Sequence, residues 1–543
     1  MGKSSILILG AGLMQKPAIL SAKELGLKVF VIDADDKAVC VKKADVFKQI
    51  DLKDKEGILE YATELKSKEN LACVFTAGTD FSSSVSYVSQ KLGFASHSYE
   101  AALNASIKTQ MRECFEKFNV PSPAFVRVEE KDIGPFLLKK IREKMDFPLV
   151  VKPVDNMGAR GCRMVRSIIE FDPAIKAAVQ ASRTGVAIVE EYMEGPEYSI
   201  DALIYNNTMT ITGFAERHIC YPPYFIEVGH TMPAILEKDV HDQLISVFAL
   251  GAKALGLTCG AAKADIKFTS KGPMIGEIAA RLSGGYMSGW TYPYASDFNL
   301  TKQAIVIACG QEPTDLFLKR KPVPFTPSEL CKDSEEPYKL FEIECTRISA
   351  ERAWMSIPGT VEYIENIEDF TDKAVFDFLP RATVNLGRDV DFPRNNVEKC
   401  GNIIAVSHNR EIAIKAAENA VSNVFITLAP NNDRTERFLA NNSLQDEKEF
   451  PPSAYGELSL KDFSSIFGVL EKDASALKNI PEFLKSADYI NKVDWNYNTI
   501  TQTAEKFDIL RPKHPAIDAR KFWRAVIRGG LQAAVYVSDS TRG

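Results

Sequence analysis

The sequence lacks paired cysteines, a strong charge of one sign and any internal repeat. Its ten cysteines are scattered along the chain, and none stands in a C-x-x-C pair. A zinc ribbon and a disulfide framework are therefore not expected, and a reducing, cytoplasmic location fits the cysteine usage better. The formal net charge is −6, so the chain lacks the basic character of nucleic-acid-binding proteins, and we expect no nucleic-acid partner.

Long apolar runs are missing as well, which argues against a membrane partner. The first apolar run is too short for a secretory signal and leads directly into a turn at Gly10. Residues 525–537 form the longest apolar-looking stretch near the C-terminus, but they contain Arg528 and Gln532 and are too short to span a bilayer. We therefore expect no membrane anchor.

The composition is that of an ordinary globular protein, with 45% apolar and 25% charged residues in 543 positions. A chain of this length predicts roughly three or four domains. Residues 5–9 read as a buried strand, followed by a turn with Gly10 and Gly12, a helix over about 17–25 and a strand over 28–33. This order predicts a βαβ unit with a parallel sheet.

A lysine followed by a glycine-rich loop is the most informative feature of the chain. A short apolar strand ends near Lys152, and the loop after it contains Gly158, Arg160 and Gly161. Glycines let backbone N–H groups crowd against an anion, and the arginine adds positive charge beside them. The pattern lacks the residue order of a P-loop but favours a phosphate-holding loop. An ordinary hairpin turn is the alternative.

An acidic segment follows this loop. It begins as a strand near Glu190, breaks at Gly195 and Pro196, and resumes as a strand at Glu197. A strand that stops short offers its free backbone edge to a flat ring such as adenine. A carboxylate a few residues further can accept hydrogen bonds from both ribose hydroxyls. The alternative is a surface hairpin with acidic residues.

Two further acids lie on strands that a tight turn connects. Asp265 and Glu277 are predicted to face one another across this hairpin, and two hard carboxylates at one point suit Mg²⁺. Arg281, two pleats beyond Glu277 on the same face, would reach the same volume. The backbone of the turn that follows is expected to accept a small carboxylate or phosphate. That turn consists of Ser283, Gly284 and Gly285. Solvated acids on a surface hairpin are the alternative.

Taken in this order, these pieces resemble the ATP-grasp superfamily of carboxylate–amine and carboxylate–thiol ligases over roughly residues 1–430. The similarity includes Gln15 in the opening turn and Lys108 ahead of the glycine-rich loop. Among members, the chain is most similar to biotin carboxylase, carbamoyl phosphate synthetase and the purine-pathway and L-amino-acid ligases. The resemblance implies an α/β and α+β multidomain fold. Its parts would be a Rossmann-like pre-ATP-grasp domain (1–103), a two-lobed ATP-grasp domain (104–320) with a lid subdomain at about 124–200, a mixed α/β closing domain (321–438), and a linker with a mostly helical C-terminal region (439–543).

The resemblance also implies roles for single residues. Lys108 and Lys152 would contact the ATP phosphates. Lys152 and Arg281 would be catalytic, and Arg281 would stabilise the acyl phosphate or orient the carboxylate. Asp265 and Glu277 would hold Mg²⁺ or Mn²⁺. The lid over the phosphates would be formed by Gly158, Ala159, Arg160 and Gly161. Adenine would be met by Glu190 and by the backbone of Glu191, Tyr192 and Met193, and the ribose by Glu197.

The sequence departs from the family pattern at the metal-binding strands. Ala279 stands where the family usually has an asparagine, which puts a complete two-metal ligand set in doubt. Asp265 stands where glutamate is more common, so its reach is shorter.

The activity that the resemblance implies is a two-step ligation. A carboxylate attacks the γ-phosphoryl group of ATP to give an acyl phosphate, and an amine or similar nucleophile then displaces phosphate. The expected partners are therefore a small-molecule carboxylate and an amine. The glycine loop would have to close over the site, because an acyl phosphate hydrolyses readily.

Three regions carry weaker assignments. Glu227 and His230 are expected to recognise substrate or move a proton, unless the histidine only satisfies backbone groups. The segment Thr76–Asp80 lies at the sheet edge where α/β proteins bind ligands, but a helix cap formed by Thr79 or Asp80 is favoured there. The amphipathic stretch near the C-terminus is expected to pack against the ligase core or across a homodimer interface.

Two rival functions stay open at this point. Gly10, Gly12 and Asp33 mimic a dinucleotide-binding fingerprint, as in an NAD(P)-dependent oxidoreductase, although Gln15 replaces the third glycine. A non-catalytic relative that binds a nucleotide or a partner is the second rival, and Ala279 is the feature in its favour. The two lysines, the loop and the two acids favour an active ligase over both.

Overall fold

The computed structural model describes residues 4–365, 372–381, 384–440 and 450–542, and the chain divides into two units. Unit 1 comprises Met1–His218 and His230–Ser349. Unit 2 comprises Ile219–Gly229 and Ala350–Gly543. The division into four domains that the sequence suggests stays a prediction.

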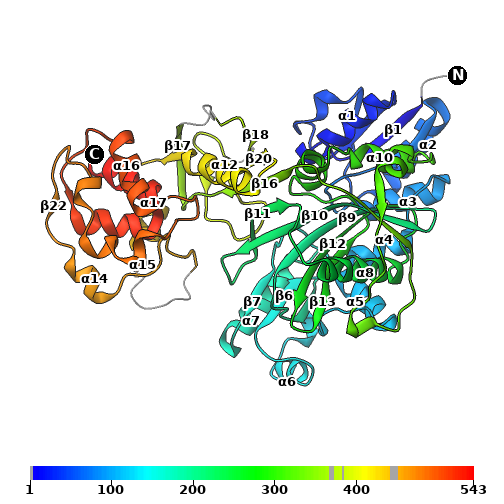
Figure 1. Cartoon of the computed structure of the whole chain (residues 1–543), viewed down its shortest axis with the longest axis horizontal. Helices are drawn as coiled ribbons and strands as arrows, with labels where there is room; N and C mark the ends of the chain where they lie inside the picture. The colour runs from blue at the N-terminus through cyan, green and yellow to red at the C-terminus, as the bar shows by residue number, and fades with distance from the viewer. Residues whose placement is uncertain (1–3, 366–371, 382–383, 441–449, 543) are drawn as a thin grey trace. The chain divides into compact units, whose positions relative to one another are not determined.

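A parallel sheet begins unit 1, and helices cover both of its faces (Figure 1). Its elements are β1 (Ser5–Leu9), α1 (Lys16–Glu24), β2 (Lys28–Asp33), β3 (Val46–Gln49), α2 (Lys55–Lys68), β4 (Leu71–Phe75), α3 (Ser82–Leu92) and, from later in the chain, α10 (Leu300–Ala308). The strand order is β3-β2-β1-β4. Because side chains alternate along β1, Ile6 and Ile8 join the core with α1 and α10, whereas Leu7 and Leu9 join the core with α2 and α3. The predicted βαβ unit is confirmed.

A small antiparallel sheet carries the glycine-rich loop. Its elements are β5 (Phe125–Glu129), α6 (Leu137–Arg142), β6 (Leu149–Pro153), β7 (Arg163–Val165), α7 (Ile168–Ala181) and β8 (Val186–Glu191), with the strand order β5-β8-β6-β7. Leu149 and Val151 of β6 are fully buried against Phe171 and Ile175 of α7. The intervening Val150 and Lys152 therefore point to the opposite face of the sheet.

The central sheet of unit 1 is antiparallel and runs in the order β13-β12-β9-β10. Its strands are β9 (Glu197–Tyr205), β10 (Thr208–Cys220), β12 (Gly260–Thr269) and β13 (Gly272–Ala279), and the last two residues of β10 belong to unit 2. In addition, β15 (Lys339–Ile343) runs parallel to β10, and β14 (Arg320–Pro322) pairs with β15. The helices α4 (Tyr99–Ser106), α5 (Lys108–Lys117) and α8 (Lys238–Ala254) share a core with it. The other helices of unit 1 are α9 (Tyr292–Ser296) and α11 (Thr314–Lys319).

Unit 2 combines short strands with helices around one core. Its strands are β16 (Ile348–Trp354), β17 (Gly359–Glu365), β18 (Val375–Pro380), β19 (Asp389–Val390), β20 (Gly401–Ser407), β21 (Phe425–Leu428), β22 (Val469–Leu470) and β23 (Ile517–Asp518), and β11 (Ile226–Met232) begins in it. Its helices are α12 (Arg410–Asn423), α13 (Asp433–Ala440), α14 (Leu460–Ser465), α15 (Ala487–Ile490), α16 (Ile500–Leu510) and α17 (Ala519–Arg542). In Figure 1 the other C-terminal helices gather around α17. None of the helices that the structure describes combines the length and apolarity needed to cross a membrane.

A kink inside α17 packs closely against Asp494, another residue of unit 2. Gly529 and Gly530 leave helical geometry, so α17 is two helices across a kink. Gly530 has φ 60° and ψ −150°, a conformation open essentially only to glycine. A Cβ at this position would lie 2.6 Å from Oδ2 of Asp494, which is itself buried and accepts hydrogen bonds from two backbone N–H groups.

Replacing Gly530 by alanine is expected to lower the free energy of unfolding by about 2–4 kcal/mol, since strain and steric overlap add. Gly468 is the matched control, because it also has positive φ but has open space where a Cβ would lie. Gly468→Ala should cost only about 1 kcal/mol, the strain alone. Urea unfolding of both variants measures the difference, and equal costs would show that the contact with Asp494 is not rigid.

Candidate active site

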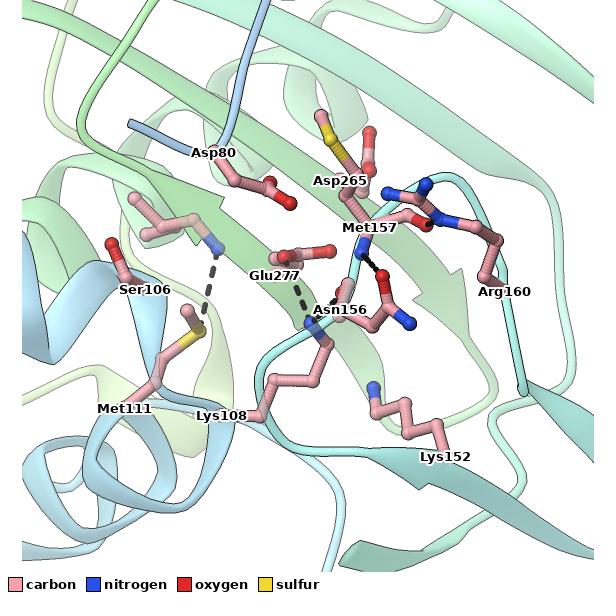
Figure 2. Close-up of polar contacts among 12 residues, drawn as sticks. Asp80, Ser106, Lys108, Met111, Lys152, Asn156, Met157, Arg160, Asp265 and Glu277 are labelled. Atoms are coloured by element: carbon pink, nitrogen blue, oxygen red, sulfur yellow. Dashed lines mark hydrogen bonds and ion pairs between the residues drawn. The ribbon is translucent and has the colours of Figure 1, made fainter. Parts of the chain in front are cut away.

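The central sheet brings two carboxylates of unit 1 to one position. Asp265 on β12 pairs in register with Glu277 on β13, as the sequence predicted. Asp265 contacts the ammonium group of Lys263, and its Oδ2 lies 3.0 Å from Nη1 of Arg217. Oδ1 of Asp265 is buried and has no hydrogen-bond partner among the described residues. Glu277 Oε1 lies 3.4 Å from Nζ of Lys108 (Figure 2).

Lys108 is the first residue of α5 and connects this helix to the glycine-rich loop. Its backbone N–H donates to the carbonyl of Val154 at 3.1 Å, and its Nζ donates to the carbonyl of Asn156 at 2.9 Å. The side chain is about 10% exposed, so the ammonium group is held rather than free in solvent. The loop and Glu277 thus share one lysine (Figure 2).

Lys152 enters the same region from β6. Its Nζ lies 2.6 Å from Oε2 of Glu190, whose Oε1 accepts from Nε of Arg112 at 2.9 Å. Arg112 also donates to the carbonyl of Gly276 at 2.6 Å, next to Glu277. Burial alone would raise the pKa of Glu190, but Arg112 and Lys152 outweigh it and lower the pKa below its ordinary value. Glu190 is therefore an ionised support between two cations.

The charges of this cluster act on Glu277 together. Burial would raise the pKa of Glu277, but the positive charges of Lys108, Lys263, Lys152 and Arg281 lower it to about 2. Cations from α5 and β6 and acids from β12 and β13 therefore meet around one volume, although they lie far apart in the sequence. Figure 2 shows Lys108, Lys152, Glu277 and Asp80 directed toward that volume.

The loop over residues 154–161 is anchored at its base and turned tightly at its tip. Asp155 accepts hydrogen bonds from the hydroxyl of Ser182 and the N–H groups of Arg183 and Thr184 at 2.9–3.0 Å. Its tip has positive φ at Gly158, Ala159 and Gly161, and Arg160 folds back so that Nε donates to the carbonyl of Met157 at 3.1 Å. The positive φ values explain why glycines stand in this loop.

The segment after β8 lies against the turn-side end of the β12–β13 hairpin. The backbone N–H of Glu191 donates to Ala124 at 3.0 Å, and that of Tyr192 donates to Pro148 at 3.3 Å. Lys267 donates to the carbonyl of Met193 at 3.2 Å and lies over the ring of Tyr192. Its Nζ is also 3.6 Å from Oε2 of Glu197, which contacts Arg217.

Arg281 and the turn over Ser283–Gly285 follow β13. The strand ends at Ala279, so the expectation that Arg281 lies on the same strand face as Glu277 is wrong. Its Nη1 donates to the carbonyl of Leu282 at 3.0 Å, yet its charge still acts on Glu277. The turn is held from inside by Asp201, which accepts from the N–H and hydroxyl of Ser283 at 3.0 and 2.8 Å.

Asp80 lies beside this charged cluster, although the sequence favoured a helix cap at its position. The expected cap by Thr79 or Asp80 is wrong, since α3 begins at Ser82 with Phe81 as its N-cap and has no side-chain cap bond. Asp80 instead lies 3.2 Å from Nη2 of Arg183. Burial raises its pKa, Glu277 adds to this, and Arg281, Arg183 and Lys108 oppose it. Its place at the carboxyl end of β4 was the signal.

Glu227 and His230, which the sequence predicts to recognise substrate or move a proton, fall in different units. Glu227 belongs to unit 2, where its carbonyl accepts from Nζ of Lys399 at 2.7 Å and its N–H donates to Asn396 at 2.8 Å. His230 belongs to unit 1 and is 1% exposed on β11. Their roles toward a substrate stay a prediction.

In the turn after β1, the side chains of Asp33 and Gln15 form hydrogen bonds within the protein, at the place where a dinucleotide would bind. Asp33 Oδ2 accepts from the N–H of Ala11 at 2.7 Å, so this carboxylate closes the turn. Gln15 is buried, lies against Gly10 and donates to the carbonyl of Ala77 at 2.6 Å. The look-alike fingerprint therefore has a structural explanation, which removes the main support for an oxidoreductase.

Comparison with known proteins identifies the domain that carries this cluster. Residues 145–289 match the family of ATP-grasp domains. The chain is 20% identical over 462 residues to the uncharacterized protein y4rH of Sinorhizobium fredii. This match covers 83% of this chain and 86% of y4rH. It is 23% identical over 342 residues to carnosine synthase 1 of Gallus gallus, covering 59% of this chain but only 36% of the synthase.

Solved structures share the fold of the chain. An L-amino acid ligase from Bacillus licheniformis matches with a TM-score of 0.63 at 17% identity, covering 79% of this chain and all of the ligase. A second match is the biotin carboxylase domain of the Hydrogenobacter thermophilus 2-oxoglutarate carboxylase, with a TM-score of 0.57 at 17% identity. The match covers 79% of this chain and 91% of that domain, which was solved with ADP, its magnesium salt and bicarbonate. The expected resemblance is therefore confirmed: the chain contains an ATP-grasp domain and has the α/β multidomain fold of ATP-grasp ligases.

Proposed function

We propose that unit 1 is an ATP- and Mg²⁺-dependent ligase that activates a carboxylate as an acyl phosphate for attack by an amine or similar nucleophile. The observation that carries the proposal is the cluster of Lys108 and Lys152 around Glu277, which pairs across the hairpin with Asp265. Neutralising a triphosphate and its transferring phosphoryl group is the main catalytic need of such a reaction, and this cluster supplies the charges for it.

The chemistry of the donors fits a magnesium ion. Asp265 has a buried oxygen without a hydrogen-bond partner among the described residues, and Glu277 is ionised. No group of three or more potential metal-ligating side chains gathers in the described part of the chain. Two carboxylates that share the ion with phosphate oxygens and water are the arrangement that Mg²⁺ prefers, and Mn²⁺ can replace it. When bound, the ion would neutralise charge on the transferring phosphoryl group.

Lys108 and Lys152 would bind the phosphates, and the loop over 154–161 would cover them. The shared carbonyl contacts of Lys108 with Val154 and Asn156 tie the loop to α5, so phosphate binding and loop position are coupled. Glycines at the tip give the backbone freedom to close over the nucleotide and exclude water.

The acidic segment would bind the nucleoside, but Glu190 would not take part in this binding. Because Arg112 and Lys152 engage its carboxylate, we assign Glu190 to positioning Lys152 rather than to contact with adenine. The backbone of residues 191–193 would meet adenine, and Glu197 would meet the ribose, with Lys267 close to both.

Arg281 and Asp80 would act on the two substrates. Arg281, followed by the turn over 283–285, would orient the carboxylate and stabilise the acyl phosphate. Asp80 carries a carboxyl group whose raised pKa suits a group that accepts a proton from an ammonium substrate. The name of the similar L-amino acid ligase supports amino acids as the substrate class. A cytoplasmic location and a homodimer are part of the proposal.

The decisive experiment incubates the purified protein with ATP, Mg²⁺ and pools of carboxylates and amines. Stimulated phosphate release, followed by mass spectrometry of a new amide, is the expected result. ATP binding without stimulated release in any pool would instead indicate a non-catalytic nucleotide-binding protein. A change in NAD(P)H absorbance with the same pools would indicate an oxidoreductase.

A further inference from the structure

Asp201 is a buried acid that the roles above leave unused. It lies on β9 with 0% of its surface exposed. Its Oδ2 accepts both the backbone N–H and the hydroxyl of Ser283, at 3.0 and 2.8 Å. Its Oδ1 is buried and has no hydrogen-bond partner among the described residues. One oxygen of the carboxylate thus fixes the turn, and the other accepts no hydrogen bond from the described residues.

The turn that Asp201 fastens is held at two further points. The hydroxyl of Ser288 donates to the carbonyl of Ser283 at 2.6 Å. The N–H of Gly78 donates to the carbonyl of Leu282 at 3.3 Å, and the Cα of Gly284 packs where a side chain on Gly78 would lie. Asp201 therefore supplies the inner anchor of a turn whose outer side rests on the loop that leads to Asp80.

Charged and titratable groups surround Asp201 from each neighbouring element. Lys263 lies opposite it on β12, where it contacts Asp265, and Arg281 follows the end of β13. Tyr292 of α9 donates its hydroxyl to the carbonyl of Ser199, two residues before Asp201. Burial, and then the charge of Asp201, raise the pKa of this tyrosine, while Arg217 opposes the rise.

The charge of Asp201 is unfavourable for the folded state. Burial raises its pKa from 3.8 to about 6, although Ser283, Lys263 and Arg281 act to lower it. Because the folded-state pKa lies above the ordinary value, the folded protein binds this proton more tightly than the unfolded chain does. The contribution to stability is present at low pH and is lost as the pH rises from about 3.8 to about 6.

We propose that Asp201 is a positioning residue for acyl transfer: its carboxylate locks the turn at Ser283 so that Arg281 and the amides of Gly284 and Gly285 face the carboxylate being activated. The inference rests on the proposed ligase function. A misplacement of a catalytic group by about 1 Å can cost roughly a hundredfold in rate, so a fixed turn has a direct catalytic value. A buried charge that costs stability is retained for that purpose.

The test compares Asp201→Asn with a buried acid of the same unit that has a structural role. Asparagine keeps the size and one oxygen acceptor but removes the charge. The control is Asp242→Asn, because Asp242 on α8 is 5% exposed, and its carboxylate contacts Lys238 and His241 of the same helix. The measurements are the melting temperature at about pH 7, hydrogen exchange of the amides over 283–287, and steady-state ADP release.

For Asp201→Asn we expect a melting temperature equal to or above that of the wild type, with exchange over 283–287 at least tenfold faster. We expect kcat to fall roughly 10- to 100-fold while KM for ATP stays within about twofold. Asp242→Asn should show the reverse pattern, a lower melting temperature with unchanged kcat. A lower melting temperature together with unchanged exchange and kcat in Asp201→Asn would overturn the proposal.

Phosphate release by the wild type tests the ligase function, whereas the comparison of Asp201→Asn with the wild type tests the positioning role. If the wild type releases no phosphate with any substrate pool, the ligase proposal fails, and exchange and melting still report whether the charge of Asp201 fastens the turn. If the wild type is active and Asp201→Asn matches it in kcat and in exchange, only the positioning role is wrong.

Discussion

Replacing Lys152 by alanine is expected to abolish ATP-dependent phosphate release while the protein stays folded. Lys152 would supply positive charge to the phosphoryl group in transfer, and loss of one such electrostatic contact costs about 10²–10³ in kcat or more. The fold should persist because Glu190, the buried partner of Lys152, keeps its second ion pair with Arg112. Phosphate release with the substrate pool that activates the wild type is the measurement, with circular dichroism as a check on folding.

Lys140→Ala is the matched control for this variant. Lys140 belongs to α6 of the same subdomain and is exposed, so its removal should leave phosphate release unchanged. Undiminished turnover in Lys152→Ala would contradict the assigned role. Loss of activity together with loss of folded structure would instead show that the pair with Glu190 holds the subdomain together, and Lys152→Met would then separate charge from packing.

Replacing Glu277 by glutamine is expected to reduce kcat/KM by roughly 100- to 1000-fold and to raise the Mg²⁺ concentration needed for half-maximal rate at least tenfold. The side chain keeps its size, but a neutral amide oxygen is a weaker ligand for a hard cation than a carboxylate. Glu277 also balances Lys108, Lys263, Lys152 and Arg281, so the variant leaves these cations less compensated. Magnesium titration of phosphate release measures both effects.

The pH dependence of stability gives a second readout for Glu277. Its pKa falls from 4.5 to about 2 on folding, so the stabilisation by its charge is fully present above about 4.5 and is lost as the pH falls toward 2. Glu277→Gln should therefore be less stable than the wild type at about pH 7, with a difference that shrinks below pH 4.5. The exposed Glu336→Gln should show neither effect. An unchanged magnesium requirement would exclude Glu277 as a metal ligand.

Motifs that act through local geometry were predicted well from the sequence. The hairpin with Asp265 and Glu277 has the predicted register because side chains alternate along paired strands, and one tight turn fixes which residues lie opposite. The glycines after Lys152 lie at positive φ, as a tightly turned loop requires. The βαβ unit at the N-terminus follows from the same local rules.

The surroundings of residues with distant partners were predicted less well. Asp80 was assigned to a helix cap because its sequence neighbours favour one, and only packing of its loop beside Arg281 and Glu277 gives it another environment. Glu190 was expected to contact the nucleoside, but its carboxylate pairs with Arg112 of α5 and Lys152 of β6, two residues far from it in the sequence. Arg281 lies beyond its strand because β13 ends at Ala279.

By itself, the sequence indicated candidate residues for phosphate and metal binding, through side-chain chemistry, through spacing within single strands and loops and, for Lys108, through the resemblance to ATP-grasp ligases. Tertiary structure decided which of these charged side chains lie close enough to interact. Charge interactions depend on distance in space and on burial, and neither quantity is encoded in the separation of Lys108, Asp201 and Glu277 along the chain.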